Sequence, residues 1–249
     1  MAKYRAVLQY AGGRYSGWQV QKDRDTVQGA LNQALRRITG LEKVSWVGAG
    51  RTDAGVHAMG QCAHFRLPEA AQAEGLQRAL NGVLPWDIRV QKLSRVQDAF
   101  HARRDALKKL YEYRIHHGPV LPPFRHGWVY HSYYRLDPER FRQGADLLRG
   151  TWDFSGFAAS SSSVKTHVRT VFESRLRRQG SLLRYQIEAD GFLQHMVRNI
   201  VGTLLEIARG RRAPEDVLRI LASRDRRNAG PTAQPQGLYL IKVFYPASS

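Results

Sequence analysis

The chain has 249 residues, 43% of them hydrophobic and 10% aromatic, which excludes a wholly disordered protein and allows one large core or two smaller ones. Its 39 Lys and Arg outnumber 21 Asp and Glu, and the net charge of +18 favours a nucleic-acid partner, because bound phosphates release counterions. The alternative explanation of this charge is that GC-rich coding and adaptation to heat raise the arginine content without any RNA partner. The single cysteine, Cys62, excludes an intrachain disulfide and disfavours a thiolate metal site.

The sequence shows no sign of export or of membrane insertion. Residues 3–8 have the pattern of a strand and lack the apolar region of a signal segment. No apolar run approaches the ~18 residues that span a bilayer. We therefore expect a cytoplasmic protein without a membrane partner.

The first half of the chain is predicted to follow the order β-α-β-β-α-β. Alternating apolar residues predict a strand over 4–10, and a helix follows, with a capping box at Asp25 and Gln28 and its end at Gly40. The remaining elements are strands over 44–49, 61–67 and 88–96, and a weaker helix over 70–81 that Gly75 interrupts.

The second half repeats this order with one additional helix. A strand is predicted over 110–116, and a helix begins at Asp137 and Pro138 and stops at Gly150. A hairpin over 171–189, a helix over 193–208, a short helix over 215–221 and a strand over 238–245 follow. Residues 117–136 and 151–169 lack periodicity, and the serine run 160–163 is expected to be a mobile surface loop.

Two such repeats predict an α+β protein built of two ferredoxin-like halves, residues 1–106 and 107–249, with mainly antiparallel sheets. The first half carries Asp53, and the second carries Tyr111, Arg198 and Leu238. We expect the two sheets to join across a central basic cleft that accommodates an RNA helix.

The segment GAGRTDAG at residues 48–55 is the strongest candidate for chemistry. Its glycines let the backbone approach a ligand closely, and the predicted strand before it provides a rigid base. Arg51 is placed to hold a phosphate or to keep the carboxylate of Asp53 ionised. The alternative is an Asx-turn, in which Asp53 only binds nearby backbone amides.

Motifs for other chemistries are missing from the sequence. No second acid lies at glycosidase-like proximity to Asp53, and the nine histidines show no metal-ligand spacing. No phosphate-binding P-loop or dinucleotide fingerprint is present. The sequence therefore supports neither a histidine metal site nor a nucleotide cofactor.

The sequence RTDAGVHA at residues 51–58 resembles the signature of the TruA-type tRNA pseudouridine synthases. Further segments resemble the same family in order and spacing. They are GWQ (17–19), TVQG (26–29), FHAR (100–103), LYEYRI (110–115), GFL (191–193), HMVRN (195–199), AGPT (229–232) and GLYL (237–240). The resemblance therefore extends over nearly the whole chain.

This resemblance implies an isomerase that converts uridine to pseudouridine at positions 38–40 of the tRNA anticodon stem-loop. It further implies a homodimer that needs neither metal nor cofactor. Three residues depart from the family pattern: Trp152 stands where a histidine is usual, and Asn32 and Asp105 are atypical. None of them falls in the RTDAGVHA segment, so they bear on packing or tRNA fit.

The resemblance also implies roles for five residues. Asp53 is the carboxylate that acts on a uridine flipped out of its stack. Arg51 fills the vacated space and holds phosphate, and Tyr111 stacks on the target base. Arg198 pairs with Asp53, and Leu238 forms a wall of the uracil pocket. The alternatives are a solvated surface arginine for Arg51 and ordinary strand core for Tyr111 and Leu238.

Two other kinds of protein would share the basic charge. A non-catalytic RNA-binding protein would use the same surface without changing the RNA. A nuclease would normally show a metal cluster or a pair of histidines. The RTDAGVHA segment favours the synthase over both.

Overall fold

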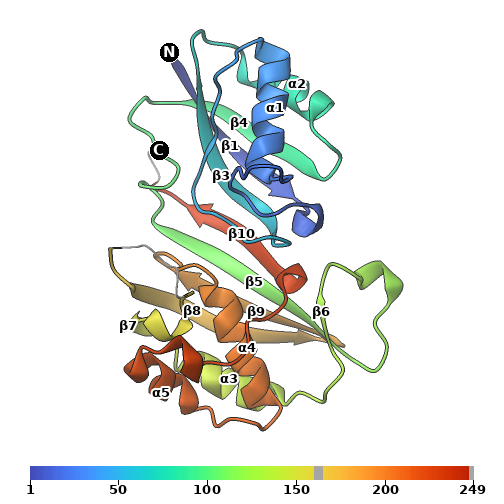
Figure 1. The fold of residues 1–249 in the computed structure, drawn as a ribbon, viewed down its shortest axis with the longest axis vertical. Coiled ribbons are helices and arrows are strands. Elements are labelled where there is room, and N and C mark those ends of the chain that lie inside the picture. The colour runs from blue at the N-terminus through green and yellow to red at the C-terminus, as the bar shows by residue number, and fades with distance from the viewer. Residues whose placement is uncertain (160–164, 247–249) are drawn as a thin grey trace. The chain divides into compact units, whose positions relative to one another are not determined.

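The computed structural model describes residues 1–159 and 165–246, and the serine run at 160–163 lies outside them. The chain forms two compact units (Figure 1). Unit 1 comprises residues 1–107 and the C-terminal segment from Tyr239, and unit 2 comprises residues 108–238. The last strand, which we expected in the second half, thus lies almost wholly in unit 1. The ranges 1–106 and 107–249 as domains stay a prediction.

Unit 1 is built on an antiparallel sheet with the strand order β4-β1-β3. The short β2 pairs with β3 in the antiparallel sense, and β10 pairs with β3 in the parallel sense. The strands are β1 (Ala2–Tyr10), β2 (Val47–Gly48), β3 (His57–Leu67), β4 (Ile88–Val96) and β10 (Leu238–Phe244). Tyr4, Ala6 and Leu8 of β1 are fully buried, as the alternation of apolar residues predicted.

Two helices, α1 (Val27–Thr39) and α2 (Ala73–Val83), pack against each other in unit 1. Gly40 ends α1 in the left-handed conformation with φ of 70°, as predicted. The predicted capping box is wrong, because the N-cap is Thr26, whose hydroxyl accepts from the Gly29 amide. The side chain of Gln28 instead donates to the carbonyl oxygen of Trp46.

Two further predictions in unit 1 are wrong. The strand expected over 44–49 shrinks to β2, because side chains of α1 bind the backbone of Trp46: Asn32 accepts from its amide and Gln28 donates to its carbonyl. Gly75 does not interrupt α2, and a Cβ there would meet nothing within 4 Å. The helix continues through this glycine, although a glycine in a helix interior lowers stability by about 1 kcal/mol relative to alanine.

In unit 2 the strands pair in the antiparallel sense in the order β5-β9-β8-β7, and β6 runs parallel to β5. Its strands are β5 (Lys108–His117), β6 (Tyr130–Ser132), β7 (Gly150–Asp153), β8 (Val168–Gln179) and β9 (Leu182–Ala189). The predicted hairpin is confirmed as β8 and β9. Because β6 and β7 have only three and four residues, they showed no periodicity in the sequence.

The helices of unit 2 are α3 (Pro138–Asp146), α4 (Met196–Ala208) and α5 (Asp216–Ser223). Asp137 caps α3 by accepting from the amides of Glu139 and Arg140, as predicted. The helix ends at Asp146, and Gly150, with φ of +107°, begins β7 instead of stopping the helix. Short 3-10 turns lie at Gly12–Arg14, Pro123–Arg125, Ser155–Phe157, Arg226–Asn228 and Pro235–Gly237.

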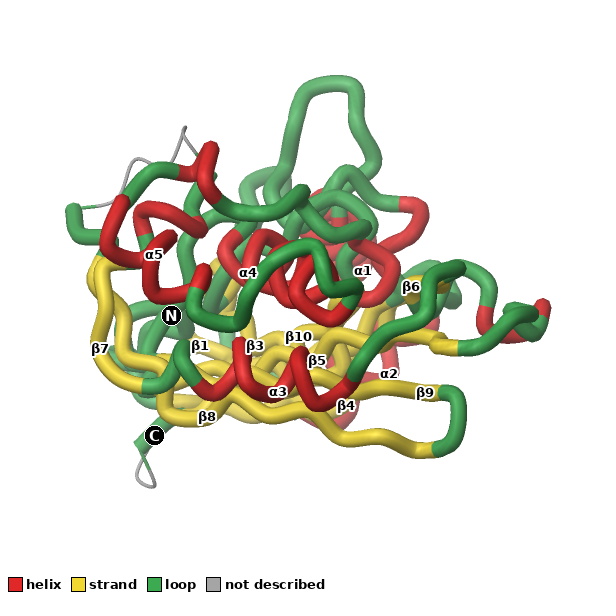
Figure 2. The backbone as a smooth tube through the Cα atoms, turned by 90° about the horizontal axis from the view of Figure 1, so that it is seen from below, coloured by secondary structure: helices red, strands yellow, loops and turns green. Residues whose placement is uncertain are grey.

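The described residues confirm an α+β fold with mainly antiparallel strand pairing. In unit 2, α3 packs along β8 and against α4 (Figure 2). Ile200, Val201 and Leu204 of α4 are fully buried. Within the residues that the structure describes, no helix combines the length and the apolar character that a membrane span requires. The strands and helices of the two units position the residues considered next.

Candidate active site

The RTDAGVHA segment lies where unit 1 passes from β2 to β3. We call residues 49–56 the signature loop. Arg51 is exposed, Thr52 is buried and Asp53 is half-buried, so the loop alternates between facing solvent and facing the core. Both charged residues predicted for the site therefore have access to a ligand.

Buried polar side chains hold the backbone and the threonine of the signature loop. The hydroxyl of Tyr10, at the end of β1, lies 2.9 Å from the hydroxyl of Thr52. Gln61, fully buried on β3, donates to the carbonyl oxygen of Gly50 at 2.9 Å and to the Tyr10 hydroxyl at 3.4 Å. Burial raises the pKa of Tyr10 to about 12, so its hydroxyl keeps its proton at neutral pH.

Backbone contacts hold the signature loop on the side of residues 12–18. The Trp18 amide donates to the Thr52 carbonyl at 3.0 Å, and the Gly55 amide donates to the Tyr15 carbonyl at 3.2 Å. Gly17 has φ of +92°, and a Cβ at this position would lie 2.7 Å from the Thr52 carbonyl oxygen. This close approach requires glycine at residue 17.

His57 follows the signature loop and is buried at the start of β3. Its Nδ1 accepts the Gly12 amide at 3.1 Å, which leaves the proton of a neutral ring on Nε2. The ring stacks on Tyr239 of β10, with ring centroids 4.8 Å apart and 19° between the planes. His57 thus links the end of the signature loop to Gly12 and to Tyr239 of β10, and these contacts give it a structural role.

Tyr111 lies on β5 in unit 2, opposite Ile187 of β9. It is buried, and its ring and that of Phe192 form a T-shaped pair, with centroids 4.9 Å apart and 79° between the planes. Such an edge-to-face contact orients an aromatic ring without covering both of its faces. The ring is therefore held in one orientation by its neighbours.

Arg198 is half-buried near the start of α4. Its Nε donates to the carbonyl oxygen of Ala233 at 2.7 Å, while the Ala233 amide donates to the Arg198 carbonyl at 3.0 Å. This pair of bonds ties the helix to the segment that leads into Leu238. Leu238 itself is buried at the first position of β10.

The segment before Leu238 packs closely on α4 and β5. A Cβ on Gly202 of α4 would lie 1.6 Å from the Pro231 carbonyl oxygen, so only glycine fits there. The buried side chain of Asn199 accepts from the hydroxyl of Thr232 at 2.7 Å. Tyr113 donates its hydroxyl to the Gln234 carbonyl at 2.7 Å. The AGPT segment and the residues that follow it thus have a packing role.

The predicted residues therefore fall into two groups, each fixed within its own unit. Arg51 and Asp53 lie in unit 1, and Tyr111, Arg198 and Leu238 lie in unit 2. Their assembly into one site, including a pair between Arg198 and Asp53, stays a prediction.

Sequence reasoning missed the side chains that hold the signature loop, although a glutamine within an apolar strand at residue 61 was a usable signal of a buried hydrogen bond.

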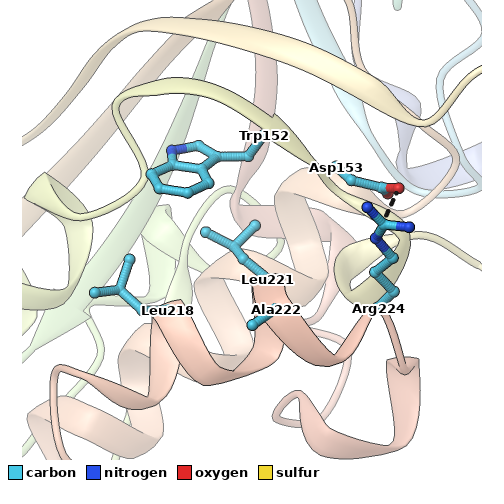
Figure 3. Close-up of a pocket in the computed structure, with 6 residues that line it drawn as sticks. All are labelled: Trp152, Asp153, Leu218, Leu221, Ala222 and Arg224. Carbon is cyan, nitrogen blue, oxygen red and sulfur yellow. Dashed lines mark ion pairs between the residues drawn. The ribbon is translucent and has the colours of Figure 1, made fainter.

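A separate groove lies between β7 and α5 in unit 2, with a volume of about 550 Å³ (Figure 3). It is lined by Trp152, Asp153, Leu218, Leu221, Ala222 and Arg224. Burial opposes ionisation of Asp153, but hydrogen bonds from Ser155 and the charge of Arg224, 3.2 Å away, outweigh it and lower the pKa of this carboxyl. Trp152, which departs from the family pattern, thus belongs to an apolar groove that none of the five predicted site residues lines.

No group of three or more His, Cys, Asp or Glu able to hold a metal occurs among residues 1–159 and 165–246. The carboxylate of Asp53 and the guanidinium groups of Arg51 and Arg198 are the charged groups that the two predicted clusters contain. Such groups suit acid–base or nucleophilic chemistry on an anionic substrate.

Comparison with known proteins identifies the family. The family described as tRNA pseudouridine synthase matches residues 6–105 and 145–246. The chain is 44% identical to a tRNA pseudouridine synthase A of Thermoanaerobacter sp. (strain X514) over 245 residues, which cover 98% of this chain and 100% of the relative. It is 43% identical to that of Syntrophomonas wolfei over 249 residues, covering 100% of both chains.

A third relative, from Protochlamydia amoebophila, is named tRNA pseudouridine synthase A 1. It is 40% identical over 245 residues, which cover 97% of this chain and 96% of the relative. The matches include the signature loop and the segments of unit 2 that pack on α4. The chain therefore belongs to the tRNA pseudouridine synthase family and is an isomerase that converts uridine to pseudouridine in tRNA.

Proposed function

We propose that this enzyme modifies uridines at positions 38–40 of the tRNA anticodon stem-loop, with Asp53 as the catalytic carboxylate. The reaction breaks the bond between N1 of uracil and C1′ of ribose, turns the base and joins C5 to C1′. C5 loses its proton and N1 gains one, so the isomerisation consumes no redox equivalents and no energy source. The protein must supply a carboxylate, a place for the turned base and a route for protons.

The observation that carries the proposal is the position of Asp53. It is half-buried on a loop in which Gly50 is held by the buried side chain of Gln61, and Thr52 by that of Tyr10. A carboxylate held in this way can attack C1′, attack the uracil ring or remove the C2′ proton. All three routes require the ionised form at a defined distance from the sugar.

A uridine within a stem is reached only after it is flipped out of its stack, at a cost of a few kcal/mol. Arg51 is exposed next to Asp53, which supports its role in filling the vacated space and holding a backbone phosphate. Tyr111 has an orientation fixed by Phe192, which supports its role in stacking on the uracil, worth about 1–3 kcal/mol.

Arg198 is the proposed partner that keeps Asp53 ionised. Its Nε is held by the Ala233 carbonyl, which fixes the guanidinium group on α4. Arginine keeps its charge even when partly buried, so it favours the carboxylate form of a neighbouring acid. Leu238 follows the segment that Arg198 holds, and we assign it to the wall of the uracil pocket.

The family resemblance supports a homodimer that acts in the cytoplasm. Sedimentation velocity of the purified chain, with and without tRNA, measures its mass directly. A monomer under both conditions contradicts the homodimer without affecting the assignment of Asp53.

Release of tritium from tRNA labelled at uracil C5 tests the role of Asp53. We expect Asp53→Asn, which is nearly isosteric, to abolish release while tRNA still binds. Asp98→Asn removes an exposed carboxylate of unit 1 and is the matched control. Equal release by the native chain and Asp53→Asn contradicts the proposal. Substrates with a single labelled uridine at position 38, 39 or 40, or elsewhere in the tRNA, test the choice of target.

The role of Arg198 is tested by Arg198→Met. We expect turnover to fall sharply, with Arg219→Met as the control, because Arg219 is exposed on α5 of the same unit. Turnover near the native value in Arg198→Met contradicts the proposed pairing with Asp53. Thermal unfolding of both variants separates a loss of chemistry from a loss of fold.

A further inference from the structure

Residues 118–134, which connect β5 to α3 and include β6, expose several large rings in unit 2. We call this segment the aromatic loop. Phe124 is 94% exposed and Tyr133 is 83% exposed, and Trp128 and Tyr134 are also exposed. Large apolar side chains that gather on one surface mark an interaction site more often than an isolated exposed residue does.

The aromatic loop is fixed in place by two histidines. His116 donates from Nε2 to the Val120 carbonyl at 2.8 Å, and its Nδ1 lies 3.2 Å from the guanidinium of Arg125. His131 on β6 donates from Nε2 to the Gly118 carbonyl at 2.8 Å, and its ring lies 4.3 Å from that of Tyr133. The exposed rings therefore lie on a loop whose backbone is fixed by these hydrogen bonds.

The loop encloses a shallow cavity of about 440 Å³. Its aliphatic walls include Val120 and Leu121, and its rings include His126, His131 and Tyr133. This volume lies in the range of sites for small planar ligands. Flat rings beside an apolar wall suit an aromatic ligand that stacks on them.

The surroundings of the aromatic loop favour a negatively charged partner. No Asp or Glu occurs among residues 117–136, whereas Arg125 and Arg135 do. Burial and then the charges of Arg178 and Arg135 lower the pKa of His117 at the base of the loop. The electrostatic potential around the aromatic loop is therefore positive, which favours a polyanionic partner over an uncharged apolar one.

We propose that the aromatic loop binds an unstacked nucleobase of the tRNA, at a place separate from the predicted uracil pocket. This inference rests on the tRNA activity of the family and adds a second contact for the same substrate. Exposed rings stack on a base of any sequence, and nearby arginines hold the phosphates on either side of it. Tyr133, which lines the cavity, and the exposed Phe124 supply the rings, and the hydrogen bonds of His116 and His131 fix the backbone of the loop.

The test measures tRNA affinity in the Asp53→Asn background by filter binding at constant salt. We expect the double change Phe124→Ala with Tyr133→Ala to weaken binding about tenfold, the order of one lost base stack. Phe124→Tyr with Tyr133→Phe keeps both rings and restores the affinity. Trp86→Ala is the matched control, because it removes an exposed ring from unit 1. The salt dependence stays unchanged in all variants, since no charge is removed.

Unchanged affinity in the alanine variant overturns the inference. Unchanged affinity together with a change in sedimentation mass assigns the rings to a contact with a second copy of the chain, which also overturns it. Tritium release with Asp53 intact separates this inference from the proposed function. We expect the alanine variant to raise KM about tenfold at an unchanged kcat. A native chain that releases no tritium, while its rings still support tRNA binding, contradicts the proposed chemistry and leaves the second contact standing.

Discussion

The signature loop and the aromatic loop are both held by side chains of neighbouring strands, yet the side chains that they expose differ in chemistry. In the signature loop, the buried Tyr10 and Gln61 hold the backbone and leave Arg51 and Asp53 accessible. In the aromatic loop, histidines hold the carbonyl groups and apolar rings are left exposed. One loop presents charged groups and the other presents stacking surfaces.

Under the two proposals above, the loops serve different parts of the reaction. Fixing a loop in advance lowers the entropy that is lost when a ligand binds or reacts. A fixed carboxylate serves the chemical step, so changes beneath the signature loop are expected to lower kcat. Fixed rings serve binding, so changes in the aromatic loop are expected to raise KM.

The largest effect is expected from Gly17→Ala. The new Cβ would lie 2.7 Å from the Thr52 carbonyl oxygen, and residue 17 has φ of +92°, so the signature loop must move. Displacement of a catalytic group by about 1 Å costs about 100-fold in rate, and we expect kcat for tritium release to fall by this order. Gly13→Ala is the control, because its Cβ meets nothing within 4 Å. Equal kcat values in both variants would show that the signature loop accommodates the added Cβ without displacing Asp53.

A smaller loss of turnover is expected from Tyr10→Phe. The change removes a hydroxyl that contacts Thr52 and Gln61, and we expect kcat to fall about tenfold with KM unchanged. Tyr185→Phe is the matched control, because it removes a buried hydroxyl that lies 2.8 Å from Ser174 in unit 2. Both variants are expected to lower the free energy of unfolding by about 1–3 kcal/mol. A parallel loss of kcat in Tyr185→Phe would assign the effect to stability alone.

A still smaller effect is expected from His131→Phe. The change keeps a ring beside Tyr133 but removes the hydrogen bond to the Gly118 carbonyl, so the aromatic loop loosens. We expect tRNA affinity to weaken about threefold, measured by filter binding, at an unchanged kcat. A fall in kcat would contradict the separation of the two loops. His167→Phe is the control, because His167 of unit 2 lies outside the aromatic loop and does not line its cavity.

The smallest effect concerns the strand that follows the signature loop. Burial, and then the charges of His101, Lys3 and Arg66, lower the pKa of His64 on β3 to about 4. Between pH 6.5 and 4 the unfolded chain binds more protons than the folded chain, so stability falls as the pH falls through this window. We expect His64→Gln to flatten the dependence of Tm on pH. An unchanged slope in this variant would contradict the assignment.

Features that depend on nearby residues were predictable from the sequence. The cap at Asp137, the end of α1 at Gly40 and the β8–β9 hairpin were all predicted, because each depends on a few consecutive residues. The predicted cap at Asp25 was wrong, because Gln28 binds Trp46 instead. The predicted length of β2 was also wrong, because Gln28 and Asn32 of α1 bind the backbone of Trp46.

The candidate site was predictable only in part. The RTDAGVHA motif singled out Asp53 and Arg51, and resemblance to the family added Tyr111, Arg198 and Leu238. The roles of these five residues stay predictions. The side chains that hold the signature loop were not predicted, since Tyr10 and Thr52 are 42 positions apart and Tyr10 and Gln61 are 51 apart.

The sequence by itself thus determined the α+β class, the order of the main elements, the family and the identity of the candidate carboxylate. Periodicity, caps and motifs act over short distances along the chain, where the residue types alone specify the outcome. Tertiary structure decided which buried groups hold the signature loop, where Trp152 packs and which rings stay exposed in the aromatic loop. These depend on contacts between distant residues, and hydrogen bonding and burial at such contacts follow from the folded geometry and not from spacing.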